Sequence, residues 1–420
     1  MTLANKTQSP YRKWLVAIGC FLMVFLGMGF CSSTKGLFLG AITKDLDIPR
    51  DMFSLQDTFR FAVTAITNIF FGTLLAKFGP RIIAAAGFMC FAGYLTISIY
   101  TDQVVMFYIA GCLLGIATSF CSTAMVSYMV NLWFPEKRGT VSGAIMCANG
   151  IGGAIATQLL DPIIKAQTFG YRNAFMLSLI ITLITGVAVV LLVTKPKGAT
   201  GTVTKKKARG AMWSGISCKE ALRKPYFYAA IFCVLLTGMA LQGIHGIAKA
   251  HMDDAGVSDA KNVMSICSLV LTGSKFLSGF SYDKLGLRRT ILICELCAVG
   301  GFTCLAFCGA GSFGYVMAVT FAVLSALSLP LETVMIPLIT ADLFGEKDFS
   351  KLLGYFVAAN YTGYAIGGYV FNRFQVMTGS YVGILLAAAV VMGAIIVGFQ
   401  LILSAANRTR KQVESQQITQ

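Results

Sequence analysis

Long, nearly uninterrupted hydrophobic runs alternate with short polar segments along the whole chain. Because a helix rises about 1.5 Å per residue, a run of about 20 apolar residues matches the hydrocarbon core of a bilayer. Six such runs cover residues 14–34, 53–75, 82–99, 104–126, 141–164 and 174–193, and six more cover 227–248, 262–281, 290–308, 315–340, 352–371 and 382–403. The pattern predicts an all-α membrane protein with twelve transmembrane helices.

A polar, basic stretch separates the two sets of runs and divides the chain into two six-helix halves. The predicted segments are an N-terminal tail at 1–13, a first half at 14–194, a linker at 195–225, a second half at 226–403 and a C-terminal tail at 404–420. The first run is too long for a secretory signal peptide, so we interpret it as a spanning helix.

Composition and charge agree with a membrane protein and add an orientation. Hydrophobic residues make up 56% of the 420 residues and charged residues 12%, about half the charge of a soluble chain. The formal net charge is +16, but the basic residues lie between apolar runs, so we expect no nucleic-acid partner. The tails and the connections on the same side of the membrane as the basic linker contain 24 lysines and arginines. The connections on the other side contain 6. The positive-inside rule therefore predicts a multi-pass protein of the cell (cytoplasmic) membrane with both termini cytoplasmic.

The cysteines and short motifs give no sign of enzyme chemistry. Most of the 13 cysteines fall inside apolar runs, and the single CxxC, Cys294 to Cys297, has no histidine partners. We therefore expect neither a disulfide framework nor a metal site. The sequence contains no HExxH, GxSxG or GxxxxGK[ST] motif, so we predict no catalytic residues, no cofactor and no ATP-driven transport.

Short segments of the first half recur in the second half at a nearly constant offset. Gly72–Arg81 parallels Gly279–Arg288 at 207 residues, Phe134–Lys137 parallels Phe344–Lys347 at 210, and Ala148–Asn149 parallels Ala359–Asn360 at 211. Three matches in the same order, at the same places relative to the spans, indicate duplication of a six-helix unit.

The repeated loop Gly-x-x-x-(Asp)-Lys-x-Gly-x-Arg resembles the signature of the major facilitator superfamily, and the resemblance covers essentially the whole chain. Trp133–Gly139 with Ser142–Gly143 is similar to the corresponding loop of the oxalate/formate antiporter family, which is related to the monocarboxylate transporters. The resemblance implies a major facilitator fold and secondary transport, although a fold alone fixes no substrate.

The same resemblance implies that the loop signatures form a cytoplasmic gate. The gate residues would be Gly72, Gly79, Arg81, Gly279, Asp283, Lys284, Gly286 and Arg288. The first loop has Ala76 where the pattern has an aspartate, so we expect the second loop, with Asp283, to carry the closure.

Lys275 is the most informative charge inside a predicted span. It lies eight residues before Asp283, about 12 Å along the helix and near the bilayer midplane. A charge at that depth needs a partner or a water-filled cavity. The resemblance places an arginine for the substrate carboxylate on this span, and Lys275 aligns with it. The alternative interpretation is a buried pair with a carboxylate.

Two further cations lie toward the outer side of the first half. Arg60 has Asp57 one turn away, so the pair either satisfies itself at the interface or attracts anions into an outward-facing cavity. Lys35 resembles a lysine that monocarboxylate transporters carry on span 1, although a snorkelling lysine is a comparable alternative.

The second half also contains intramembrane acids and a histidine. Glu332, between Pro330 and Pro337, is the candidate proton-binding group or counter-ion to Lys275, with a structural hydrogen bond as the alternative. Asp57 and His245 are further candidates for these roles, and the alternative for His245 is a hydrogen-bonded interior histidine. We expect Glu295, six residues after Arg289, to pair with the basic loop.

Asn149 and Asn360 occupy equivalent places in spans 5 and 11, each followed by glycines that permit close helix packing. We predict that both line the substrate cavity. The family often has a second cation where Asn360 stands, so its absence favours a singly charged substrate.

The resulting hypothesis is a secondary transporter for a small organic anion, a monocarboxylate, that works by alternating access and anion exchange. The alternatives are a proton-coupled monocarboxylate symporter and, from another class, a transporter-like nutrient receptor. We expect the lipid bilayer and the anion as partners, and a monomer.

Overall fold

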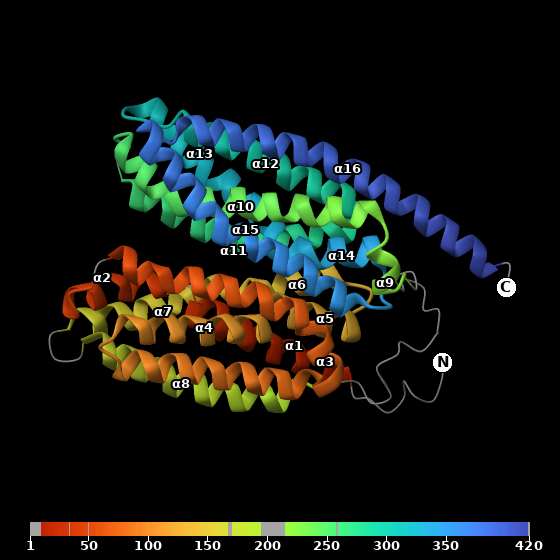
Figure 1. The fold of residues 1–420 in the computed structure, drawn as a ribbon, viewed down its shortest axis with the longest axis horizontal. Coiled ribbons are helices and arrows are strands. Elements are labelled where there is room, and N and C mark those ends of the chain that lie inside the picture. Colours follow the sequence, from red (N-terminus) through yellow and green to blue (C-terminus); the bar gives the residue numbers. More distant parts are fainter. Residues whose placement is uncertain are drawn as a thin grey trace. The chain divides into compact units, whose positions relative to one another are not determined.

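The computed structural model describes residues 10–32, 34–48, 50–166, 170–194, 215–257 and 259–418, and within them the regular elements are all helices (Figure 1). The chain divides into two compact units, residues 1–207 and 208–420. Most of the predicted linker, residues 195–214, and positions 1–9 of the predicted N-terminal tail lie outside the described residues. Each unit is considered by itself below.

The N-terminal unit contains nine helical elements. They are α1 (Pro10–Val24), the π-helix η2 (Phe25–Ser32), α2 (Lys35–Asp45), α3 (Arg50–Tyr100), α4 (Val104–Phe120), α5 (Thr123–Trp133), α6 (Arg138–Met146), α7 (Ala148–Lys165) and α8 (Gly170–Leu192), all within the described residues. Within this unit α3 packs along α4 and α8, and α7 packs against η2.

The C-terminal unit has a similar order of elements. They are α9 (Cys218–Ala221), α10 (Pro225–Asp254), α11 (Ala260–Leu285), α12 (Leu287–Ala306), α13 (Ser312–Ser328), the π-helix η3 (Leu331–Met335), α14 (Ile336–Phe344), α15 (Phe349–Thr378) and α16 (Val382–Ile418). Here α10 packs along α15, and α12 packs against α13 and α16.

Ten helical segments of the described chain are long and apolar enough to cross a membrane. One of them, Leu55–Tyr100, has 46 residues and contains two spans, because the backbone of α3 is non-helical at Gly79. The 30-residue helix α15, whose sequence is more polar, is outside this set and covers the predicted eleventh span. All twelve predicted apolar runs therefore fall on helices, and the protein is a multi-pass, all-helical membrane protein.

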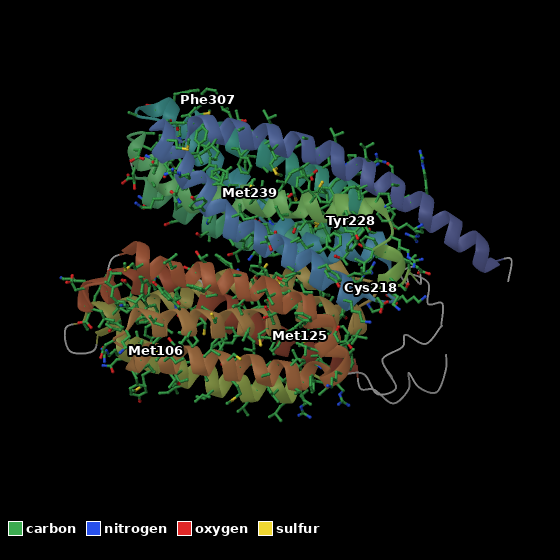
Figure 2. The ribbon with its side chains drawn as sticks, in the orientation of Figure 1. Met106, Met125, Cys218, Tyr228, Met239 and Phe307 are labelled. Carbon is green, nitrogen blue, oxygen red and sulfur yellow. The ribbon has the colours of Figure 1, made fainter. Side chains whose placement is uncertain are left out.

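The side chains on the outside of the helices are largely apolar, as lipid contact requires. Tyr228 on α10 and Phe307 at the end of α12 are each 58% exposed. In Figure 2, Phe307 and Cys218 mark opposite ends of the C-terminal unit.

The repeated loop has the same backbone geometry in both units. Gly79 has φ 80° and ψ 163°, and Gly286, 207 positions later, has φ 80° and ψ 168°. L-residues with a side chain rarely adopt a positive φ, so glycine allows one helix to end and the next to begin at a sharp turn. The internal repeat is therefore present in the conformation as well as in the sequence.

Helix packing repeats in the same way. A Cβ on Gly152 of α7 would lie 2.2 Å from the Phe25 carbonyl oxygen, and a Cβ on Gly363 of α15 would lie 2.2 Å from the Leu235 carbonyl oxygen. Both glycines lie where two helix backbones touch, one pair in each unit. The absence of a side chain is what permits this distance.

The predicted C-terminal tail is helical over most of its length. The segment predicted as a tail from residue 404 continues α16 as helix to Ile418, and Figure 1 shows this helix running past the others of its unit. The segment is polar but contains no proline or glycine and several strong helix formers, so polarity ended the predicted span without ending the helix.

Candidate functional site

Lys275 lies ten residues before the end of α11, and only 3% of its surface is exposed. The preceding residue, Ser274, fixes this part of α11 to α13 by donating a hydrogen bond of 2.6 Å to the Ala326 carbonyl oxygen. The ammonium group is therefore attached to a rigid element in the interior of the C-terminal unit.

Glu332 lies close to this lysine in the same unit. It belongs to the π-helix η3, and 4% of it is exposed. Its Oε2 accepts hydrogen bonds of 2.9 Å from Gln242 Nε2 on α10 and from the Tyr364 hydroxyl on α15. Its Oε1 accepts none within the described residues, and its carboxylate interacts electrostatically with Lys275. Single π-turns within α-helices often mark functional positions.

Asn360 lies near the same cluster, but its side-chain amide is directed toward α10. It is 2% exposed and interacts with Tyr364 one turn further along α15. Its Oδ1 lies 2.6 Å from the place a Cβ of Gly238 on α10 would take. The amide thus packs between α15 and α10, and its role in lining the substrate cavity stays a prediction.

Two residues that the prediction left out of the site, Gln242 and Tyr364, donate hydrogen bonds to the predicted site residue Glu332. Tyr364 follows Asn360 by four residues, so helical spacing alone would have placed both on one face. His245, on α10 three residues after Gln242, has a buried Nδ1 with no hydrogen-bond partner among the described residues.

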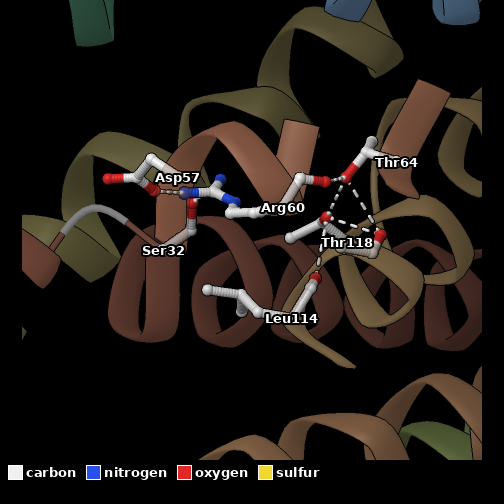
Figure 3. Close-up of polar contacts among 7 residues, drawn as sticks. Ser32, Asp57, Arg60, Thr64, Leu114 and Thr118 are labelled. Atoms are coloured by element: carbon white, nitrogen blue, oxygen red, sulfur yellow. Dashed lines mark hydrogen bonds and ion pairs between the residues drawn. The ribbon is translucent and has the colours of Figure 1, made fainter. Parts of the chain in front are cut away.

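The polar groups of the N-terminal unit begin with Arg60 on α3 (Figure 3). Its Nη1 lies 3.4 Å from Asp57 Oδ1, and its Nη2 donates a hydrogen bond of 2.6 Å to Ser32 Oγ at the end of η2. The Arg60 side chain is 11% exposed and the Asp57 side chain 47%. The predicted i,i+3 pair is present, and Arg60 also links α3 to η2.

Neutral groups continue this network between α3 and α4. The Thr64 and Thr118 hydroxyls lie 3.3 Å apart, and both lie within hydrogen-bond distance of the Gly115 carbonyl oxygen. Asn68, fully buried, donates 3.0 Å to Ser119 Oγ and 2.8 Å to the Thr64 carbonyl oxygen. Figure 3 shows the threonine part of this network beside Arg60.

The remaining predicted residues of this unit are less informative. Asn149 lies near the start of α7, with its carbonyl oxygen 2.7 Å from the place a Cβ of Gly29 would take. Lys35 is the first residue of α2, and its side chain lies outside the described residues.

The arginines of the loop signatures bind within their own units. Arg81 Nε donates a hydrogen bond of 2.7 Å to the Val190 carbonyl oxygen on α8, and Arg288 Nε donates to Gln400 Oε1 on α16. Lys284 lies over the Phe280 ring at 4.5 Å, and Asp283 is exposed. Each arginine thus attaches its loop to the last helix of its half.

Glu295 is not where the sequence interpretation put it. We expected it to pair with the basic loop, but it is fully buried in α12, and neither carboxylate oxygen has a hydrogen-bond partner among the described residues. Arg288 is two turns away, with its Nε bonded to Gln400. The six-residue spacing from Arg289 was a poor guide because six residues place two side chains on different faces of a helix.

Twelve apolar helical runs, two structurally repeated halves and a buried lysine and glutamate define a membrane protein of the solute-transporter class. No group of three His, Cys, Asp or Glu residues that could hold a metal occurs among the described residues. The sequence profile described as Major Facilitator Superfamily matches residues 20–368, and the chain belongs to that family of secondary transporters, not to an enzyme family.

Individual relatives are distant. The chain is 26% identical over 376 residues to the uncharacterized MFS-type transporter YhjX of Escherichia coli, covering 86% of this chain and 87% of YhjX. It is 27% identical over 314 residues to the oxalate:formate antiporter of Oxalobacter formigenes (71% and 69%) and 22% identical over 384 residues to monocarboxylate transporter 12-B of Danio rerio (82% and 78%). The outward-facing crystal structure of FucP matches with a TM-score of 0.70 at 14% identity, covering 92% and 98%. That likeness concerns the fold.

Proposed function

We propose that this protein moves a small organic anion, a monocarboxylate, across the cytoplasmic membrane by alternating access. The observation that carries the proposal is the burial of Lys275 in the middle of α11. A cation held inside a membrane span attracts an anionic group strongly, because little water is available to screen it.

The chemistry around Lys275 supports a substrate with one negative charge. Glu332 brings a carboxylate into the same cluster, and a dianion would meet that charge as well as the lysine. Gln242 and Tyr364 provide a polar surface beside it. The distant relatives described as an oxalate:formate antiporter and a monocarboxylate transporter support the same substrate class.

We propose exchange as the mode of coupling. Closing an empty site around a buried cation is costly in low dielectric, and a bound anion removes that cost. Glu332 already interacts with Lys275, but its Oε2 is held by Gln242 and Tyr364 toward α10 and α15, so we propose that it stabilises the closed empty site less well than a bound anion does. Return of the carrier then depends on a second anion.

Proton-coupled symport is the second candidate, and one observation favours it. Glu332 already interacts electrostatically with Lys275. If protonation of Glu332 frees the lysine for substrate, an inward proton gradient would drive net uptake without internal anion.

The substrate proposal is tested with purified protein in proteoliposomes and a panel of radiolabelled carboxylates. Lys275→Gln should weaken monocarboxylate binding and transport about 100-fold, the scale of removing one partner of a buried charge pair. The matched control is Lys249→Gln on α10, because Lys249 is 56% exposed and pairs with Asp253 at 2.6 Å. Equal transport by Lys275→Gln and wild type would contradict the proposal.

Counterflow against net uptake tests the coupling. Exchange predicts rapid uptake only into vesicles preloaded with anion, and Glu332→Gln should retain it. Strong net uptake into empty vesicles under a proton gradient would refute exchange. Loss of that uptake in Glu332→Gln would then assign the proton to Glu332.

A further inference from the structure

Glu295 is a second buried acid of the C-terminal unit, and the transport proposal does not use it. It lies near the middle of α12, and none of its surface is exposed. Both of its carboxylate oxygens are buried without a hydrogen-bond donor in the described part of the chain. An ionised carboxylate in such a place would be strongly destabilised, since burial removes water and nothing replaces it.

The groups around Glu295 do not supply a counter-charge. Cys294 on its own helix and Cys233 on α10 are the titratable groups that interact with it. Helices α10, α11, α13, α14, α16 and η3 pack against α12, yet no lysine, arginine or histidine of their described residues interacts with this carboxyl. Both cysteine thiols are neutral groups in an apolar interior, so they cannot stabilise an anion.

The two buried acids of this unit therefore differ in chemistry. Glu332 is buried too, but it receives two hydrogen bonds and interacts with Lys275, and these contacts partly offset the cost of burying its charge. Among the described residues Glu295 has neither a hydrogen-bond donor nor a neighbouring cation, which favours the neutral acid. We propose that Glu295 is a proton-binding site, occupied in this conformation and separate from the Lys275–Glu332 cluster.

Helix α10 connects the Glu295 site to the Lys275–Glu332 cluster, because it contributes a residue to each. Cys233 interacts electrostatically with Glu295, and Gln242 donates a hydrogen bond to Glu332. These two α10 residues are nine positions apart, two and a half turns, so they lie on opposite faces of α10. Ionisation breaks the carboxyl O–H bond and passes the proton to water, so it requires a rearrangement that admits water beside α10. Low pH therefore favours the conformation with Glu295 buried, by mass action of the proton.

Infrared spectroscopy of the protein in lipid vesicles tests the site without any substrate, so its outcome is independent of the transport proposal. A protonated carboxyl has a C=O stretching band that a carboxylate lacks, and without a hydrogen bond the band lies at the high-frequency end of its range. We expect such a band at neutral pH, its loss in Glu295→Gln, and its retention in Glu332→Gln.

A second variant, Glu295→Met, keeps the test possible if Glu295→Gln does not fold. Glu295→Met is apolar and of similar size, and it should fold and abolish the band, because a neutral buried acid can be replaced without loss of a charge pair. The wild-type melting temperature should fall as the pH is raised from the ordinary glutamate range to the pH at which the band disappears, and that of Glu295→Met should fall less steeply. A band that persists in either Glu295 variant, or no band in wild type at neutral pH, overturns the proposal.

Discussion

The two halves have the same backbone geometry at their repeated positions and differ in the polar side chains that they bury. Gly79 and Gly286 turn the chain with the same φ, and Gly152 and Gly363 hold two helices in contact at the same distance. With the 207-residue offset of the repeated loop, however, Asn68 corresponds to Lys275. The first half thus has a neutral amide where the second half has a cation.

Each environment matches its residue. Asn68 donates to Ser119 on α4, and the residue 207 positions after Ser119 is Ala326, which has no side-chain hydroxyl to offer. In the second half Ser274 binds the Ala326 carbonyl oxygen, and Lys275 interacts with Glu332 instead. Duplication has preserved the parts that set helix geometry, and single side chains decide where charge is placed.

Exchanging these two residues should give the largest effect. Asn68→Lys places an ammonium group at a fully buried position whose described partners, Thr64 and Ser119, are neutral, and we expect a cost of at least about 2.5–3.5 kcal/mol and little folded protein. Lys275→Asn should remain folded and lose anion binding. Yield and monodispersity in detergent, with binding measured by calorimetry, distinguish the two.

A well-folded Asn68→Lys would mean that the first half can also accommodate an intramembrane cation. The comparison would then lose its physical basis, since the difference between the halves would lie in the residues alone and not in their surroundings. Asn68→Leu is the matched control, because it removes the hydrogen bonds without adding charge.

The sequence predicted the parts of the fold that depend on long or repeated patterns. The all-helical membrane class and the twelve apolar runs follow from hydropathy, and the repeat follows from Gly72–Arg81 and Gly279–Arg288. The helical extension to Ile418 was missed because a hydropathy pattern reports the end of a span, not the end of a helix.

Side-chain partners were predictable only where they are close in sequence. The Asp57–Arg60 pair follows from i,i+3 spacing, whereas Glu332 with Gln242 and Tyr364 needs three helices to meet. The burial of Glu295 depends on α10 and α16, which no local pattern describes. For this reason the interpretation of Glu295 as paired with the basic loop was wrong, and only the structure shows that its carboxylate has no hydrogen-bond partner among the described residues.

The shared packing should respond equally in both halves. Gly152→Ala and Gly363→Ala each place a methyl group 2.2 Å from a carbonyl oxygen, and we expect each to cost about 1–3 kcal/mol as the helices separate. Gly393→Ala on α16 is the control, since nothing lies within 4 Å of the added carbon. Thermal unfolding of the purified protein measures all three. An effect in one half only would show that the packing of the repeat is not equivalent.

Arg60 offers a smaller and kinetic test of the first half. We expect Arg60→Gln to raise the KM for an anionic substrate about three- to tenfold with little change in kcat, because a partly exposed cation raises the local anion concentration. The wild-type KM should increase with ionic strength more steeply than that of the variant. Arg172→Gln, which removes an exposed pair with Asp102 elsewhere in the same unit, should change neither. A fall in kcat at constant KM would instead assign Arg60 to conformational change, through its bond to Ser32.

The smallest expected effect lies where the linker joins the second half. Ser217 caps α9 by accepting from Glu220 N, and Glu220 accepts 2.7 Å from Ser217 N, a bond that lowers the pKa of its carboxyl. Because that pKa lies below the ordinary value of 4.5, the stabilisation is complete at neutral pH and is lost as the pH falls below 4.5.

Ser217→Ala should cost about 0.5–2 kcal/mol in α9, toward the low end because the cap is exposed. Hydrogen exchange of the α9 amides, corrected for the intrinsic rate at each pH, should show faster opening in Ser217→Ala at pH 7 and in wild type only on acidification, with Glu220→Gln less sensitive to pH. Ser217→Ala leaves the bond from Cys218 N to Asp348 Oδ2 in place. The opening should therefore stay local to α9 and leave the unfolding of α10 to α16 unchanged. If Ser217→Ala lowered the melting temperature of the whole protein, α9 would be part of the C-terminal core, and not a capped turn at its edge.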